Sequence, residues 1–342
     1  MPGVHRRRPW TFALSFTAAV AFTAFAAFAA CTGARRAQHP ANNHSQRVST
    51  TSTGEARLAV DGGRIWYRKS GVGSATPVIL LHGGPGLSSF YLKPLEALGN
   101  DRVVIRYDQL GAGKSDPLTD TTKMTIAHFV AELDSLRSAL GYEHVHLVGH
   151  SWGAVLAYEY YRSHPEHVAS LTLASPALDI PSWTRHAWRL VATLSDSAQR
   201  AIHSGEDSAK FDSPDYRRAM QEFNARYISR RPPAAELDST MSMVGESVSN
   251  YMHGPANFAI TGSLKSYDVT SKLRTIAVPT LYTVGEYDEA DPAMVKRFAS
   301  LTPEAHLVVI PGAAHITTWD NPTAMVDAVR SFLRQADGAV RR

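Results

Sequence analysis

A single serine stands between two glycines in the segment VHLVGHSWGAVLAYEY, residues 145–160. β-branched and apolar residues precede Gly149, and a helix-forming run follows Gly153. A serine at such a strand–turn–helix junction has the G-x-S-x-G pattern of a nucleophile elbow. Glycines are needed there because larger side chains would collide with the neighbouring backbone of so tight a turn. We therefore predict that Ser151 is a nucleophile; the alternative is that it only caps the helix.

A serine hydroxyl is a weak nucleophile unless a base removes its proton and an acid orients that base. In a sheet that carries such an elbow, the acid and then the histidine follow late strands of the chain. Asp288 follows the apolar run at 279–285, and His315 follows the run at 306–311. Small residues before His315 would let its loop approach the serine. These positions predict a catalytic triad of Ser151, His315 and Asp288.

Other charged and histidine residues near these motifs have simpler interpretations. Glu286 and Asp291 flank Asp288 and are interpreted as solvated loop charges, although they remain the alternatives for the acid. His82 stands at the end of an apolar run, where its ring would satisfy loop backbone, and His150 flanks the elbow. We assign no catalytic role to these histidines.

Acyl transfer at a serine also needs two N–H donors for the developing oxyanion. The residue after the nucleophile, Trp152, would supply one of them. The other is expected from the glycine-rich loop at 82–86, HGGPG, where a backbone without side chains can approach a substrate. Gly84 is our candidate because the next residue, Pro85, has no N–H. The alternative interpretation of this segment is a simple turn.

Alternating strand and helix signals indicate the element that positions these residues. An opening hairpin is expected from Arg57 across a turn at 61–63. Continuous apolar runs, typical of strands buried on both faces, occur at 77–84, 101–108, 145–150, 169–176, 279–285 and 306–311. Helical spacing occurs at 124–140, 152–163, 292–301 and 323–335. This order predicts an α/β fold with a mostly parallel, doubly wound sheet.

The alternation stops near Pro176, and for roughly 90 residues the signals are helical and amphipathic. We predict an α/β core formed by residues 56–177 and 266–338, interrupted by a helical cap at 178–265. Ligands of open parallel sheets bind outside the carboxyl ends of the strands. The insertion is therefore interpreted as a lid over the predicted triad.

Composition limits the classes of protein that this chain can belong to. The chain has 342 residues, of which 44% are hydrophobic and 19% are charged, as in a globular protein with a large core. Its net charge is +4. Three arginines at positions 6–8 belong to the leader described below, and without them the rest of the chain has a net charge of about +1. The sequence contains no basic stripe with interleaved aromatic residues, so no nucleic-acid partner is expected.

The N-terminus has the features of an export signal. A basic segment precedes an uncharged, Ala- and Phe-rich run at 10–30, and small residues precede Cys31, the only cysteine. We predict a signal peptide at 1–31 with lipid attachment at Cys31, and a flexible polar linker at 32–55. An ordinary cleaved signal and an uncleaved membrane anchor are the alternatives. All three export the chain, so the expected location is exported and membrane-anchored, or otherwise secreted or periplasmic.

Motifs along most of the chain resemble the proline iminopeptidase family of α/β-hydrolases. The resemblance covers residues 57 to 336 and rests on five segments: HGGPG at 82–86, DQLGAGKSD at 108–116, GHSWG at 149–153, GEYDE at 285–289 and GAAHIT at 313–318. It implies a helical cap, no cofactor, and release of an N-terminal residue, often proline, from short peptides. It also supports the triad and the two oxyanion donors named above.

The resemblance also implies how a free substrate amine would be bound, since that amine is cationic near neutral pH. The family holds it with carboxylates, one beside the triad acid, which matches Glu289, and one in the cap within a GPNEF-like segment. This chain has GPANF at 254–258, so Asn257 replaces the cap glutamate. Loss of such an anion would cost on the order of 1.5–3 kcal/mol of binding.

Three functions therefore remain open at this stage. The first is an exported serine aminopeptidase that acts through an acyl-enzyme. The second uses the same residues on small esters or amides without a free amine, which Asn257 makes plausible. The third is a binding protein that has lost activity, although the motifs of the triad and oxyanion loop are intact. Ser151 argues against epoxide hydrolases and haloalkane dehalogenases, whose nucleophile is usually an aspartate.

Overall fold

The computed structural model describes residues 53–232 and 235–340. The predicted signal peptide, Cys31 and most of the predicted linker lie outside this part of the chain. The first strand begins at Gly54, within the last two residues of that linker. The helices of the described residues include none with the length and apolar character that a membrane span requires.

The described residues form an eight-stranded sheet in the order β1-β2-β4-β3-β5-β6-β7-β8. β1 pairs antiparallel with β2, and β2 with β4, whereas the other neighbours are parallel. The strands are β1 (Gly54–Val60), β2 (Gly63–Ser70), β3 (Ala75–Leu81), β4 (Arg102–Asp108), β5 (Val145–His150), β6 (Val168–Ala174), β7 (Thr280–Gly285) and β8 (Ala305–Ile310). The predicted opening hairpin and the mostly parallel α/β sheet are thus confirmed.

Helices cover both faces of this sheet, because alternate residues of a buried strand face opposite sides. Ile79 and Leu81 pack in a cluster with side chains of α1 (Ile126–Ala139), α2 (Trp152–Ser163) and α8 (Pro292–Leu301). Val78 and Leu80 pack in another cluster, with the 3₁₀ helix η1 (Ser89–Asn100) and α10 (Pro322–Val340). The remaining short helices of the core are η2 (Thr121–Lys123), η3 (Pro165–His167), η4 (Thr270–Thr275) and α9 (Thr317–Asp320).

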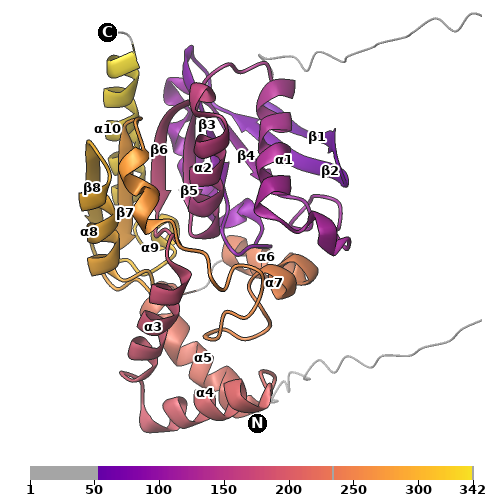
Figure 1. The fold of residues 1–342 in the computed structure, drawn as a ribbon, viewed down its shortest axis with the longest axis vertical. Coiled ribbons are helices and arrows are strands. Elements are labelled where there is room, and N and C mark those ends of the chain that lie inside the picture. Colours follow the sequence, from indigo (N-terminus) through magenta and orange to yellow (C-terminus); the bar gives the residue numbers. More distant parts are fainter. Residues whose placement is uncertain (1–52, 233–234, 341–342) are drawn as a thin grey trace, which may run out of the picture. The chain divides into compact units, whose positions relative to one another are not determined.

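The segment between β6 and β7 is helical in the structure. It contains α3 (Ile180–Val191), α4 (Asp196–Ser208), α5 (Pro214–Tyr227), α6 (Ala235–Ser242) and α7 (Glu246–Met252). Figure 1 shows α3, α4 and α5 below the sheet, at the bottom of the view. These helices have an apolar cluster of their own, in which Ile202, Tyr216, Phe223 and Phe258 are buried.

Backbone hydrogen bonds tie this cap to the loops that carry the predicted site. The N–H groups of His315 and Ile316 donate to the carbonyls of Tyr227 and Ile228, at 3.1 and 2.8 Å. Asp320 accepts from the N–H of Ala314 at 2.8 Å and from the N–H of Arg230 at 2.9 Å. The position of the loop that carries His315 therefore depends on the cap as well as on the sheet.

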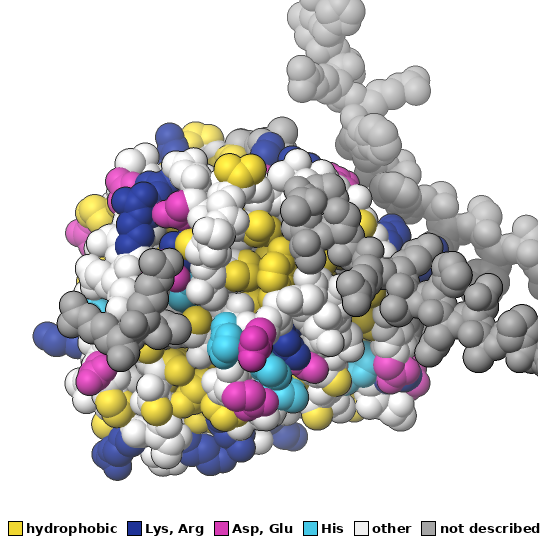
Figure 2. Space-filling model, turned by 90° about the horizontal axis from the view of Figure 1, so that it is seen from above, with side chains coloured by type: hydrophobic (Ala, Val, Ile, Leu, Met, Phe, Trp, Pro, Cys, Tyr) yellow, Lys and Arg dark blue, Asp and Glu magenta, His cyan; other side chains and the backbone are white. Residues whose placement is uncertain are grey.

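Charged side chains are mixed on the face of the molecule seen in Figure 2. Lys and Arg lie there among acidic, histidine, polar and hydrophobic side chains. On this face, the described residues form no continuous basic stripe of the kind that a nucleic-acid backbone would require.

Candidate active site

The turn after β5 holds Ser151 in a strained conformation. Its φ and ψ are 55° and −116°, a backbone region that residues with a side chain rarely adopt. A Cβ on Gly149 would lie 2.1 Å from the carbonyl oxygen of Gly153, and a Cβ on Gly153 would lie 2.1 Å from that of Leu81. Both glycines are therefore required by contact with neighbouring backbone. The turn presents Ser151 at the start of α2, as the elbow motif predicts.

Asp288 and His315 form a hydrogen-bonded pair, with 2.8 Å between Oδ1 and Nδ1. Asp288 is buried, and three further donors hold its carboxylate: the hydroxyl of Ser175 at 2.5 Å and the N–H groups of Gly285 at 2.9 Å and Ala290 at 2.8 Å. A carboxylate with so many donors has a fixed orientation. It can therefore hold the imidazole of His315 in one tautomer, with the proton on Nδ1.

Charge and burial act in opposite directions on this pair. Burial alone would raise the pKa of Asp288, but the charge of His315 and the hydrogen bonds to the carboxylate lower it below its ordinary value. Burial would lower the pKa of His315, but the charges of Asp288 and Glu289 outweigh burial and raise it. The imidazolium form of His315 is thus stabilised, as a general base requires after it has taken a proton.

Five of the predicted site residues line one cavity of about 80 Å³: Gly84, Ser151, Trp152, Asn257 and Glu289. Trp183 of the cap also lines it, and its ring packs edge-on against the His315 imidazole with 5.4 Å between ring centroids. A cavity of this size beside the Ser151 hydroxyl suits a small acyl group.

Glu289 lies between the cavity and the catalytic pair. Its Oε1 is 3.6 Å from Nε2 of His315, and its side chain is 18% exposed. Burial raises the pKa of Glu289 to about 7, while the charge of His315 lowers it and that of Asp288 raises it. Glu289 therefore changes its charge near neutral pH, where it affects both His315 and any cation in the cavity.

One backbone N–H group of the glycine-rich loop forms a hydrogen bond within the protein, and another lies at the cavity. The N–H of Gly83 donates to the Tyr91 hydroxyl at 2.7 Å, so it is already used. Gly84 has a φ of 113°, and it lines the cavity with Trp152. Among the described residues, the N–H groups of Gly84 and Trp152 have no acceptor. These two N–H groups therefore remain our candidates for the oxyanion donors at Ser151.

A buried hydrogen-bond chain links the oxyanion loop to the histidine loop. Nε2 of His150 lies 2.9 Å from the carbonyl oxygen of His315, which can only accept, so His150 carries its proton on Nε2. Its Nδ1 then accepts from the Tyr91 hydroxyl at 2.9 Å, and that hydroxyl accepts from Gly83. Burial lowers the pKa of His150 to about 3, so this neutral tautomer persists at neutral pH. These hydrogen bonds hold together the glycine-rich loop, the nucleophile turn and the loop of His315, which lie far apart in the sequence.

The residues with simpler interpretations occupy structural positions. His82 accepts from the N–H of Gln109 at 2.9 Å and donates to the carbonyl of Gly83 at 3.0 Å. Glu286 accepts from the N–H of Gly312, and Asp291 accepts from Ala293 at the start of α8. None of these three residues is among those that line the cavity at Ser151.

Sequence reasoning missed several residues that contact the site. Ser175 follows β6, which neighbours the nucleophile strand, and its position at a strand end is a usable signal. Tyr91 and Trp183 come from η1 and α3, and His253 follows α7. No sequence pattern marks these three, because their role depends on how separate elements pack.

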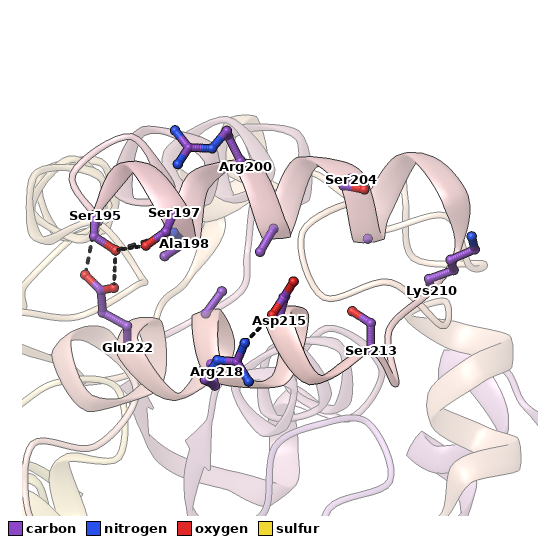
Figure 3. Close-up of a pocket in the computed structure, with 13 residues that line it drawn as sticks. Ser195, Ser197, Ala198, Arg200, Ser204, Lys210, Ser213, Asp215, Arg218 and Glu222 are labelled. Atoms are coloured by element: carbon purple, nitrogen blue, oxygen red, sulfur yellow. Dashed lines mark hydrogen bonds and ion pairs between the residues drawn. The ribbon is translucent and has the colours of Figure 1, made fainter.

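A larger hollow of about 660 Å³ lies in the cap, away from these residues. Figure 3 shows it between α4 and α5, with Ser195 bonded to Glu222 at one end and Arg218 paired with Asp215. Small side chains such as Ala198 and Ser204 leave the gap between the two helices. The residues that line it include no histidine, so it has no serine–histidine pair of the kind that Ser151 would need. Separately, the described residues include no group of three or more His, Cys, Asp or Glu placed to hold a metal ion.

Comparisons with known sequences agree with the fold and identify the family. A family model for the alpha/beta hydrolase fold matches residues 76–322. A proline iminopeptidase of Heyndrickxia coagulans is 37% identical over 282 residues, which cover 82% of this chain and 98% of that protein. A proline iminopeptidase of Saccharolobus solfataricus is 33% identical over 286 residues, covering 82% of this chain and 92% of that protein.

Solved structures give the same result. The proline iminopeptidase of Mycobacterium smegmatis superposes with a TM-score of 0.79 at 30% identity, covering 84% of this chain and all of that one. VinJ superposes with a TM-score of 0.79 at 30% identity, covering 83% and 99%. Fold and family model therefore define the chain as an α/β hydrolase. Within that class it belongs to the proline iminopeptidase family.

Proposed function

We propose that this protein is a serine aminopeptidase that releases N-terminal proline, or another small residue, from short peptides. One observation carries the proposal: the Asp288–His315 pair lies beside a small cavity whose wall contains Ser151 and the carboxylate of Glu289. A nucleophile, a base and an anion at one place suit an amide whose acyl group has a free, cationic amine. The proline iminopeptidases among its relatives support the same reaction.

The chemical steps follow from the roles of these residues. His315 Nε2 takes the Ser151 proton as the hydroxyl oxygen attacks the substrate carbonyl carbon. The resulting oxyanion accepts from the N–H groups of Gly84 and Trp152. The imidazolium then gives its proton to the leaving nitrogen as the C–N bond breaks, which leaves an acyl-enzyme. Water then attacks the ester carbonyl carbon while His315 takes one of its protons. The imidazolium returns that proton to the Ser151 oxygen as the ester C–O bond breaks, which releases the amino acid and restores the enzyme.

The test compares three substrates on the purified full chain: prolyl-β-naphthylamide, its N-acetyl form and a short-chain p-nitrophenyl ester. Ser151→Ala serves as the inactive control. Preference for the free amine, lost in the variant, is the expected result. Equal turnover of the acetylated substrate, or turnover of the ester alone, would instead favour the second function, a hydrolase of small esters or amides, for which Asn257 is the supporting observation.

We also propose export and lipid anchoring at Cys31, from the sequence pattern of residues 1–31. Cells that express the chain and are fed labelled palmitate should label it in the membrane fraction. Cys31→Ser should remove the label. Labelling that persists in this variant would contradict attachment at Cys31.

A further inference from the structure

A second carboxylate lies in the cap behind the cavity wall. Glu206, on α4, accepts two hydrogen bonds at Oε1: from the Tyr216 hydroxyl at 2.6 Å and from the N–H of Asn257 at 3.1 Å. The side-chain amide of Asn257 donates to the same hydroxyl at 2.8 Å. Gly205 makes this arrangement possible, because a Cβ there would lie 2.2 Å from the Tyr216 ring. The amide, the hydroxyl and the carboxylate therefore form one chain.

Glu206 carries a charge that the cap itself does not neutralise. Its Oε2 is buried and has no hydrogen-bond partner among the described residues. Among the described residues, no Lys or Arg forms an ion pair with Glu206. A buried carboxylate oxygen without a partner is costly, and a structure that contains one calls for an explanation beyond folding.

The wall in front of Glu206 belongs to the predicted active site. Asn257 and His253 line the same cavity as Ser151 and Glu289, and the residues lining it include no Lys or Arg. Burial lowers the pKa of His253, with the backbone of Gly254 and the charge of Glu206 acting in the opposite direction. His253 is therefore neutral near pH 7 and supplies no countercharge. The formal charges around the cavity are those of carboxylates.

The order of donors in the chain directs this charge towards the cavity. The Asn257 amide nitrogen donates to Tyr216, and Tyr216 donates to Glu206, so each bond is polarised by the carboxylate at its end. The amide oxygen of Asn257 is then the acceptor that remains for a ligand, in an assignment that follows from the hydrogen-bond pattern. An ammonium group is the ligand that such an acceptor, near two carboxylates, would favour.

We propose that Glu206 is a positioning and specificity residue, which holds the substrate ammonium group from the cap side through Tyr216 and Asn257 while Glu289 holds it from the core side. The inference rests on the proposed aminopeptidase function and extends it to a residue outside the GPANF segment. On this view, the negative charge that Asn257 lacks is supplied from the neighbouring helix. Replacement of the cap glutamate then does not remove amine recognition.

The test measures binding without turnover, on the full chain carrying Ser151→Ala. The probes are L-prolinamide and N-acetyl-L-prolinamide, titrated by calorimetry at pH 7. Glu206→Gln keeps an oxygen acceptor for Tyr216 and Asn257 but removes the charge. It should weaken prolinamide binding on the order of tenfold, the scale of one charge–charge interaction in a protein interior, and leave the acetylated probe unchanged.

A matched control comes from the same cap. Glu222 lies on α5 and pairs with Arg226 at 2.7 Å and with Ser195, away from the cavity. Glu222→Gln should change neither dissociation constant, and both variants should keep the melting temperature within a few degrees. Tyr216→Phe removes the hydroxyl that links Asn257 to Glu206 but leaves the charge of Glu206 in place. It should weaken prolinamide binding by less than Glu206→Gln does.

The outcomes separate this inference from the function on which it rests. If the Ser151→Ala chain binds the acetylated probe with the same affinity as the free amine, the aminopeptidase proposal fails. Glu206 then has no ammonium group to hold. If the parent prefers the free amine and Glu206→Gln keeps that preference, only the Glu206 inference fails. Equal weakening of both probes would show a purely structural role and would also overturn it.

Discussion

Two clusters of serine, histidine and aspartate lie at opposite ends of β5. Ser151 follows the strand and is the predicted nucleophile, and the hydrogen-bonded pair of His315 and Asp288 supplies its predicted partners. His146 lies near the start of the strand, where its Nδ1 is 2.7 Å from the Ser170 hydroxyl and its Nε2 is 3.1 Å from Asp337. The second cluster has the same three residue types, and its histidine lies within hydrogen-bonding distance of both partners. The comparison shows what a triad needs besides its residues.

Access separates the two clusters first. His146 and Ser170 are fully buried, and both ring nitrogens of His146 are occupied by protein groups. Ser170 lies within the regular strand β6, whereas Ser151 lies on a strained turn that projects it into a cavity. A substrate carbonyl can reach only Ser151. Gly84 and Trp152, the predicted oxyanion donors, line the same cavity as Ser151.

Charge separates them as well. Arg102, 2% exposed, pairs with Asp337 at 2.7 Å and neutralises it. Burial lowers the pKa of His146, the Asp337 bond and charge oppose this, and Arg102 adds to the lowering. At the other cluster, Glu289 adds a second negative charge and the pKa of His315 is raised. A base must become cationic during the reaction, so the uncompensated negative charge suits His315 for catalysis and the ion pair suits His146 for structure.

The largest expected difference comes from removing each serine hydroxyl. Ser151→Ala should lower kcat by roughly 10⁴- to 10⁶-fold, because no nucleophile remains. Ser170→Ala should leave kcat within about twofold and cost about 1 kcal/mol of unfolding free energy, since His146 loses a donor. Steady-state kinetics on prolyl-β-naphthylamide and urea unfolding measure the two effects. A large loss of kcat in Ser170→Ala would break the comparison.

Neutralising each aspartate should again divide activity from stability. Asp288→Asn should lower kcat by roughly 10³- to 10⁴-fold, because the amide cannot hold the required tautomer of His315. Asp337→Asn should leave kcat nearly unchanged but lower the unfolding free energy by about 1.5–3 kcal/mol, since the buried Arg102 loses the shorter of its two carboxylate contacts and keeps only Asp101. The same kinetics and urea titrations apply. Equal stability of the Asp337→Asn variant would argue against the structural role of that ion pair.

Removing the Tyr91 hydroxyl tests how much catalysis at Ser151 depends on the relative positions of the loops around it. Tyr91→Phe deletes the acceptor for Gly83 and the donor to His150, so the oxyanion loop and the His315 loop lose their common link. A decrease in kcat of roughly tenfold with little change in KM is expected, on the scale of one hydrogen bond of about 1–1.5 kcal/mol. The matched control is Tyr158→Phe, because the buried hydroxyl of Tyr158 has no hydrogen-bond partner among the described residues. Equal effects of the two substitutions would contradict the link.

The smallest effect concerns the charge beside His315. Glu289→Gln removes one of the anions that raise the pKa of His315, so that pKa should fall. The base then stays neutral to lower pH, and the acidic limb of the kcat/KM profile should move to lower pH. An N-acetylated or ester substrate, if turned over, is the better probe, since it does not need Glu289 for amine binding. An acidic limb that does not move would mean that Glu289 and His315 are electrostatically independent.

Much of the candidate site could be predicted because its motifs are local. The glycines around Ser151 are required by backbone contacts within a single turn, and Asp288 and His315 follow strands whose apolar runs are easy to recognise. Ser175, Tyr91 and Glu206 could not be found in this way. Each acts on a residue distant in sequence, and its side chain acquires a role only when two elements pack together.

The sequence by itself determined the α/β class and the order of strands and helices, and it predicted the serine, histidine and acid of the site, because hydrophobic period and tight-turn sterics are properties of short segments. It could not distinguish Ser151 from Ser170 by their partners, nor reveal that Glu206 lies behind Asn257. Tertiary structure decided these, because burial, access and the balance of charge around a group depend on side chains brought together from the whole chain.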